Sequence, residues 1–384
     1  MGQSDRDELS RASKTDWITR RREEKMNKRI VNYQYDVERD SVFVRSMDSG
    51  QGIAIAITLC VLFMRGLNVQ ASEVGRGGQA GSFLRMGVGA RAMAMGGGSS
   101  AMADDATAGY YNPAGLAFLK GRQAGFTLNS MALDRTLSHI AYAQSFGSDF
   151  DSTRSRKPLQ AGFSVAWLGA GVDDIDGRDY DGNHTRMYSN WENAFYFSFA
   201  IKPGPALAVG FSAKLLWSTF PRLTDTGKAM SATGLGFDLG ALLKPVPSVT
   251  LGISIHDLRS RYTWDSQKLY ERGSQTTARF PVGFSAGAAW RGFSGRVLAT
   301  ARLDQTKIVL ENGSRYLPAT FGLGVQAEAV RDFFLRAGLR GGDFTFGGGY
   351  SRTVFSKRTE LDYAFVPDPV APRGNHVFSW SFAF

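Results

Sequence analysis

The sequence predicts an all-β membrane protein: a closed antiparallel barrel of 14 transmembrane strands with a small N-terminal plug or hatch. Three observations predict this fold. They are an aromatic strand at the C-terminus, the recurrence of its alternation along the chain, and a near-regular succession of short and long connections. A closed barrel is also the β architecture that leaves no backbone hydrogen-bonding group facing hydrocarbon.

The last nine residues alternate between a large face and a small face. Four aromatic residues share the large face: Phe378, Trp380, Phe382 and Phe384. Successive side chains of a strand point to opposite faces, and the small face carries mostly Ser and Ala, so lipid on the aromatic side fits this pattern. A terminal Phe on such a strand resembles the signal that the outer-membrane barrel assembly machinery reads. We therefore expect these four residues to form the assembly signal.

The same alternation recurs in 14 segments. They start near Arg122, His139, Gln160, Ala194, Ala206, Gly234, Val249, Arg279, Gly295, Ala319, Phe333, Phe344, Thr359 and His376. Most run about 9–11 residues, which a tilted strand needs to cross a bilayer. The second face is small or polar, with single charges that we expect to face the lumen: Lys214, Asp238, Arg296, Arg336 and Asp362.

Connection lengths support the same topology. The expected short links are residues 202–205, 244–248, 291–294 and 329–332, and the expected long links are 171–193, 218–233, 259–278 and 304–318. Outer-membrane barrels have short periplasmic turns and longer external loops. Residues 147–159 and 341–343 do not follow the alternation.

Composition bounds the function. The chain has 384 residues, a net charge of +10 and 45 glycines, and glycine at this level suits strongly curved, closely packed strands. Its basic charges are dispersed, without a nucleic-acid-binding motif, so we expect no nucleic-acid partner. No run of 18 apolar residues follows Ala71, which excludes a membrane-spanning helix from the mature chain.

The first 71 residues divide into two parts. Residues 1–48 are charged and fit no export signal; they are either the product of a misassigned start, with the true start near Val44 or Met47, or a cytoplasmic extension. Residues 49–71 are expected to be a signal peptide, with an apolar core at 53–64 and a cleavage site after Ala71. A buried helix at 53–64 is the alternative. Removal of the signal would take away Cys60, the single cysteine.

Residues 72–120 lack strand alternation and precede the barrel at 121–384, so we expect them to form the hatch. Within them, Gly87, Gly89 and Ala92 mimic a dinucleotide-binding turn, but no βαβ unit surrounds them. The acidic residues 173–182 miss the spacing of a calcium loop, and the four histidines have no metal-ligand spacing. No Ser–His pair stands out. We expect no cofactor, no metal and no enzymatic activity.

The motif GVGARAMAMGG, followed by ADDATAGYYNPAGLA, resembles the N-terminal signature of the PorV/PorQ family of outer-membrane proteins. Those proteins resemble the wider FadL-like group of fatty-acid transporters, which are 14-stranded barrels. The resemblance covers roughly residues 82–384. It implies that Asn112, Pro113 and Ala114 form the motif of a hatch inside the barrel. A purely structural turn without a gating role remains the alternative.

The resemblance implies a passive FadL-like channel for small hydrophobic molecules in the bacterial outer membrane. The alternative is a PorV-like component of type IX secretion that binds secreted cargo or partner proteins. The expected partners are outer-membrane lipids, the barrel assembly machinery, and either a hydrophobic ligand or a protein cargo.

Overall fold

The computed structural model describes residues 79–384, except 99, 148–159, 224–226, 268, 270–271, 311–312, 355–356, 369–370 and 372–373. The chain divides into two units, Met1–Leu67 and Asn68–Phe384, and every described residue belongs to the second. The expected extension at 1–48 and signal peptide at 49–71 lie outside the described residues.

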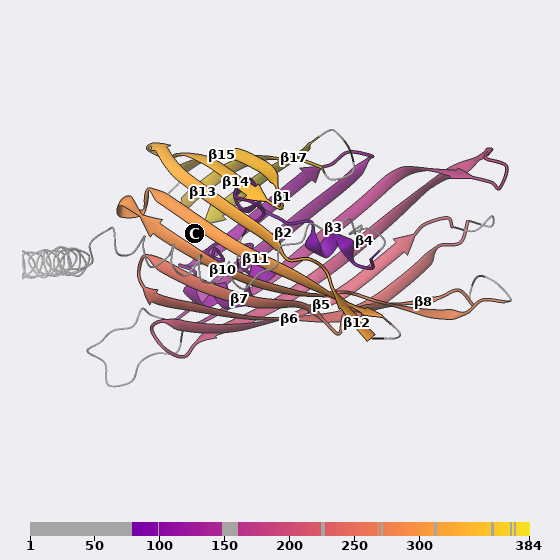
Figure 1. Ribbon diagram of the computed structural model, residues 1–384, viewed down its shortest axis with the longest axis horizontal. Helices are drawn as coiled ribbons and strands as arrows, with labels where there is room; N and C mark the ends of the chain where they lie inside the picture. Colours follow the sequence, from indigo (N-terminus) through magenta and orange to yellow (C-terminus); the bar gives the residue numbers. More distant parts are fainter. Residues whose placement is uncertain are drawn as a thin grey trace, which may run out of the picture. The chain divides into compact units, whose positions relative to one another are not determined.

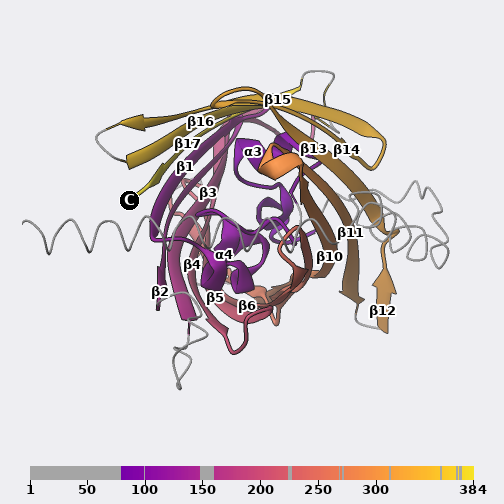
Figure 2. The same ribbon diagram turned by 90° about the vertical axis from the view of Figure 1, so that its left-hand side faces the viewer.

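Fourteen strands of the described chain form a closed antiparallel ring, as the sequence predicts (Figures 1 and 2). The ring closes because β1 pairs with both β2 and β17, the last strand. The strands are β1 (Arg122–Ser130), β2 (Arg135–Phe146), β3 (Gln160–Arg178), β4 (His184–Lys202), β5 (Leu207–Phe220), β6 (Met230–Val246), β7 (Val249–Leu258), β10 (Val282–Gly292), β11 (Val297–Leu310), β13 (Thr320–Val330), β14 (Phe333–Arg340), β15 (Asp343–Val354), β16 (Lys357–Val366) and β17 (Asn375–Ala383).

The long connections differ from the expectation, because much of their length is strand. β3 and β4 each have 19 residues, so the hairpin absorbs most of residues 171–193. Three short strands, β8 (Arg261–Asp265), β9 (Gln275–Arg279) and β12 (Gly313–Tyr316), occupy parts of two other connections. Figure 1 shows these extensions on the side opposite the C-terminus. In these extensions strand pairing supplies the hydrogen-bond partners of the backbone N–H and C=O groups. In a loop, water or side chains would have to supply them.

The outer surface of the ring is apolar, and the inner face is small or polar. On β4 the outward residues Phe197 and Phe199 are 49% and 53% exposed, while Tyr196, Ser198 and Ala200, which alternate with them, are buried. A contiguous apolar belt of this kind would be unfavourable in water. It is the surface that a membrane-spanning barrel presents to hydrocarbon.

Residues 79–120, here called the inner segment, lie inside the ring, as α3 and α4 show in Figure 2. The segment contains η1 (Ser82–Arg85), α3 (Ala90–Ala94), α4 (Ala108–Tyr111) and η2 (Pro113–Phe118); η3 (Phe293–Gly295) lies between β10 and β11. None of the helices in the described residues has the length and hydropathy needed to span a membrane.

The C-terminal strand provides a test of the assembly signal. Phe378, Trp380 and Phe384 are about half exposed on the outer face, while the Phe384 N–H donates to Arg122 O across the closing seam. Changing both Phe382 and Phe384 to Asp should block insertion, because charged residues on the lipid face are destabilising and the terminal signal is lost. Heat-modifiability of the protein in outer-membrane fractions measures this. Normal amounts of heat-modifiable double variant would show that the terminal residues are not required.

Candidate functional site

The inner segment is held against opposite walls of the barrel by close backbone contacts. A Cβ at certain wall glycines would overlap the segment or press closely on it. On one wall these are Gly324, Gly338 and Gly347 of β13–β15, which face residues 94–96. On the other they are Gly162, Gly210, Gly240 and Gly252 of β3 and β5–β7, which face residues 100–116. Glycine on the inner wall therefore makes room for a second layer of chain.

Tyrosine side chains fix the fold of the segment itself. The Tyr110 hydroxyl donates to Leu84 O at 2.8 Å and accepts from the Gly87 N–H at 3.0 Å. The Tyr111 hydroxyl donates to Val88 O at 2.7 Å. Burial raises the pKa of Tyr110 to about 12, so its hydroxyl remains a donor at neutral pH. These bonds tie residues 84–88 to α4.

Asn112 links the segment to the seam between β6 and β7. Its Nδ2 donates to Ser100 O at 2.8 Å, and lies 3.1 Å from Ala241 O and 3.2 Å from Ile253 O. Ala241 and Ile253 face each other across the two strands. The Asn112 side chain thus bonds adjacent wall strands while being fully buried.

The residues after Asn112 explain why it points this way. Pro113 occupies the first position of η2, and Asn112 is its extended N-cap, with φ −161°. Proline disfavours the helical region for the preceding residue, so α4 ends at Tyr111. Asn112 Oδ1 accepts from the Ala114 N–H at 3.1 Å, which satisfies one free donor at the start of η2. Pro113 and Ala114 are both buried.

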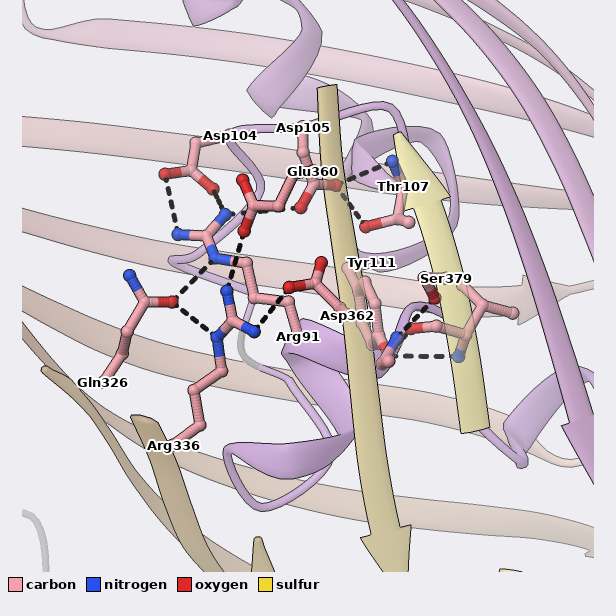
Figure 3. A network of polar contacts seen from close by, with 12 residues as sticks. Arg91, Asp104, Asp105, Thr107, Tyr111, Gln326, Arg336, Glu360, Asp362 and Ser379 are labelled. Carbon is pink, nitrogen blue, oxygen red and sulfur yellow. Dashed lines mark hydrogen bonds and ion pairs between the residues drawn. The ribbon is translucent and has the colours of Figure 1, made fainter. Parts of the chain in front are cut away.

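Arg91 of α3 is the centre of a polar network that joins the segment to the barrel (Figure 3). Its guanidinium lies 2.7 Å from Asp104 and 3.3 Å from Asp105, and it donates to Gln326 of β13 at 3.2 Å. The same Gln326 oxygen accepts from Arg336 of β14 at 2.8 Å. Arg336 in turn pairs with two acids of β16: Asp362 at 2.5 Å and Glu360 at 2.7 Å.

Asp104 also reaches a different part of the wall, because Arg291 at the end of β10 lies 2.8 Å from it. Burial alone would raise the pKa of Asp104, but the nearby charges of Arg91 and Arg291 lower it to about 2. Asp104 is therefore ionised at neutral pH and bonds the segment to β10.

A second charged cluster lies on the β5–β7 wall. Lys214 is buried, lies 2.7 Å from Asp238 and bonds Asp257. The Asp257 N–H donates to Asp238 Oδ1 at 2.8 Å, at a point where the β6–β7 register shifts between Phe237 and Leu239. Arg85 of the inner segment lies 3.7 Å from Asp257. Removing one partner from such a cluster costs about 3–5 kcal/mol, because a buried charge is left uncompensated.

The structure places four of the five predicted lumen charges on the inner face: Lys214, Asp238, Arg336 and Asp362 are buried. Arg296 does not lie on the inner face, contrary to the prediction. It is an exposed residue at the C-cap of η3, because β11 begins only at Val297.

The expected partners of these charges also need correction. Asp104 and Asp105 are the acidic residues of the expected hatch, and the sequence predicts them as partners for Lys214, Arg296 and Arg336. Instead, both acids pair with Arg91, a cation of their own segment. Lys214 and Arg336 pair with acidic residues of the barrel strands.

Several site residues were missed from the sequence: Arg85, Arg91, Asp257, Gln326 and Glu360. Glu360 precedes Asp362 by two positions and therefore shares its face, a signal that strand alternation provides. Arg91 is an isolated charge in a run of Ala, Met and Gly. Strand alternation does not identify Asp257 as inward-facing, because the β6–β7 pairing is irregular at this point.

Part of the β2–β6 wall is apolar where it meets the inner segment. Its inward residues Leu137, Leu168 and Leu216 are buried together with Phe83 and Val88 of the inner segment. Porin lumens are lined by polar groups and water, so this apolar layer is a distinguishing property. Within the described residues, no group of His, Cys, Asp and Glu is arranged to hold a metal ion.

No protein-family model matches the sequence, and no curated protein matches it. Solved structures do match. The toluene transporter TodX of Pseudomonas putida aligns with a TM-score of 0.53 at 18% identity, covering 78% of this chain and 99% of that one. The monoaromatic hydrocarbon channel CymD aligns with a TM-score of 0.51 at 16% identity, covering 78% of this chain and 98% of CymD. The toluene transporter TbuX of Ralstonia pickettii gives 0.50 at 14%, covering 78% and 99%.

These similarities show the fold, a closed 14-stranded antiparallel barrel of the kind found in outer membranes. They give no support to the PorV/PorQ assignment or to the type IX secretion alternative that accompanied it.

The wall glycines provide a test of the packing. In Gly240→Ala the new methyl group would overlap Asn112 Oδ1, so the inner segment should be displaced while the barrel remains heat-modifiable. Gly283→Ala in β10 is the matched control, since its methyl would meet His256 at an ordinary 3.5 Å. Limited proteolysis of purified barrels measures the displacement. Equal protection of residues 79–120 in both variants would contradict the packing.

Proposed function

We propose that the protein is a passive outer-membrane channel for small hydrophobic molecules. The observation that carries this proposal is the apolar layer between the inner segment and the β2–β6 wall. Leu137, Leu168 and Leu216 offer a hydrophobic passenger an environment that a water-filled porin lacks. The named activities of TodX, CymD and TbuX, which concern toluene and monoaromatic hydrocarbons, agree with this chemistry.

In this proposal the inner segment is a hatch that must move before a molecule passes. The segment touches opposite walls through backbone contacts at Gly338 and Gly210, so passage between them requires its displacement. Its polar attachments to the wall include Asn112 at the β6–β7 seam, the Arg91 network, and Arg85 beside Asp257. Further hydrogen bonds join it to Ser379, Thr345 and Ser212 of the wall. Polar bonds can be exchanged for water at low net cost, because each contributes about 0.5–1.5 kcal/mol.

The position of the Arg91 network supports a hatch that closes at one end. Arg336 and Glu360 lie in the first halves of β14 and β16, and Arg291 is the last residue but one of β10 on the same side of the barrel. The Arg91 network therefore crosses the lumen toward the side that we assign to the periplasm. The apolar layer lies toward the long strand extensions, on the external side, where a hydrophobic molecule would first be received.

Loosening the hatch should raise permeability. Asn112→Ala removes the donor shared by three carbonyl groups, and unsatisfied buried acceptors cost about 1–3 kcal/mol each. A shift of about 1 kcal/mol toward the displaced state corresponds to about a fivefold larger open population. We expect a similar increase in uptake.

The measurement is uptake of labelled toluene and of a labelled fatty acid by intact cells of a Gram-negative host that lacks its own channels for them. Asn183→Ala is the matched control, because Asn183 bonds Asp179 at an exposed hairpin tip. Wild-type uptake no faster than that of cells without the protein would refute the proposed function. Unchanged uptake in correctly folded Asn112→Ala, with wild-type uptake present, would refute the hatch.

A further inference from the structure

Two arginines lie side by side on the outer face of the barrel, and neither pairs with an acidic side chain among the described residues. The β8–β9 register places Arg261 directly opposite Arg279. Both are exposed, while the residue that follows each in the chain, Tyr262 or Phe280, is buried with Phe83 of the inner segment. Since successive side chains alternate between faces, both guanidinium groups point outward.

This arrangement is unfavourable unless an anion compensates it. Like charges directly opposite in an antiparallel pair destabilise the pair. Across the described part of the chain, no ion pair joins Arg261 or Arg279 to a carboxylate. The nearby Asp257 is buried and bonded to Lys214. Asp265, four residues along β8, accepts a hydrogen bond from the Gln267 N–H.

A third cation lies one hairpin further around the wall. Lys307 of β11 pairs with Val282 of β10, and Val282 shares its face with the outward Phe284, which is 37% exposed. Lys307 therefore lies on the same outer surface. Its ammonium group is 5.5 Å from the centre of the Tyr316 ring.

The position of the pair indicates the kind of anion. Arg261 follows the end of β7 by three residues, and Arg279 precedes the start of β10 by three. Those two strands carry outward apolar residues, with Ile253 62% exposed and Phe284 beside them. The arginines therefore lie at the border of the apolar belt, on the side of the long strand extensions. A molecule with acyl chains on the belt would bring its headgroup to them.

We propose that Arg261 and Arg279, with Lys307 nearby, bind the phosphate group of an anionic glycolipid of the outer leaflet. The planar guanidinium forms paired hydrogen bonds to phosphate oxygens, and a basic surface beside the apolar belt is a lipid-headgroup site. Free phosphate has the same headgroup chemistry but no chains to cover Ile253 and Phe284. This site does not depend on the proposed channel function.

Native mass spectrometry of the full-length protein tests the site, with phosphorylated lipid A, enzymatically dephosphorylated lipid A and inorganic phosphate as probes. The variant is Arg261→Gln/Arg279→Gln. The control, Arg331→Gln/Arg352→Gln, removes two exposed arginines near the short turns at the other end. Heat-modifiability shows that each variant is folded.

The affinity of the Arg261/Arg279 variant for phosphorylated lipid A should fall by about tenfold or more, while the control keeps the wild-type affinity. Wild-type protein should bind dephosphorylated lipid A about as weakly as the variant binds the phosphorylated form. Equal affinity of variant and wild type, or equal affinity of wild type for both lipids, would overturn the proposal. Displacement of the lipid by an equal concentration of inorganic phosphate would identify a free-phosphate site instead.

Discussion

Every backbone N–H and C=O of a strand in hydrocarbon needs a hydrogen-bond partner within the protein, because lipid supplies none. The pairing of β1 with β17 meets this constraint by leaving the ring without an edge. Closure also fixes which side chains face inward, since register determines the face of each residue. The small inner faces of β5–β7 and β13–β15 then leave space that the inner segment fills.

The second layer of chain creates its own electrostatic requirement. Charges on the inner wall are removed from water, and each needs a partner nearby. Lys214 is compensated by Asp238 and Asp257 on neighbouring strands, and Arg336 by acids of β16. Most buried charges of the wall are therefore balanced by opposite charges on other wall strands. Within the described residues, the inner segment is joined to the wall by hydrogen bonds and ion pairs, among them those of Arg85, Arg91 and Asn112, and by no covalent bond other than the chain itself.

The barrel could be predicted from sequence because alternation and closure are local rules that repeat in each strand. Strand starts such as Gln160, Val249 and Phe333 agree with the structure, whereas β4 begins ten residues before the expected Ala194. The first half of β4 is paired but lies beyond the lipid, so it lacks the alternating aromatic residues by which the sequence reveals a strand. The partners of the inward charges were not predictable, because they depend on register across strands and on the irregular backbone at Asp257, which has φ 62°.

The central claim is that the inner segment must move for a hydrophobic molecule to cross, and a reversible tether tests it most directly. A Cβ at Gly125 of β1 would stand 3.4 Å from the Ala106 Cβ, near the 3.5–4.5 Å typical of disulfides. Ala106→Cys/Gly125→Cys in a Cys60→Ser background should block uptake when oxidised and recover it on reduction, while either single cysteine behaves as wild type. Wild-type uptake by the fully oxidised, folded double variant would contradict the claim.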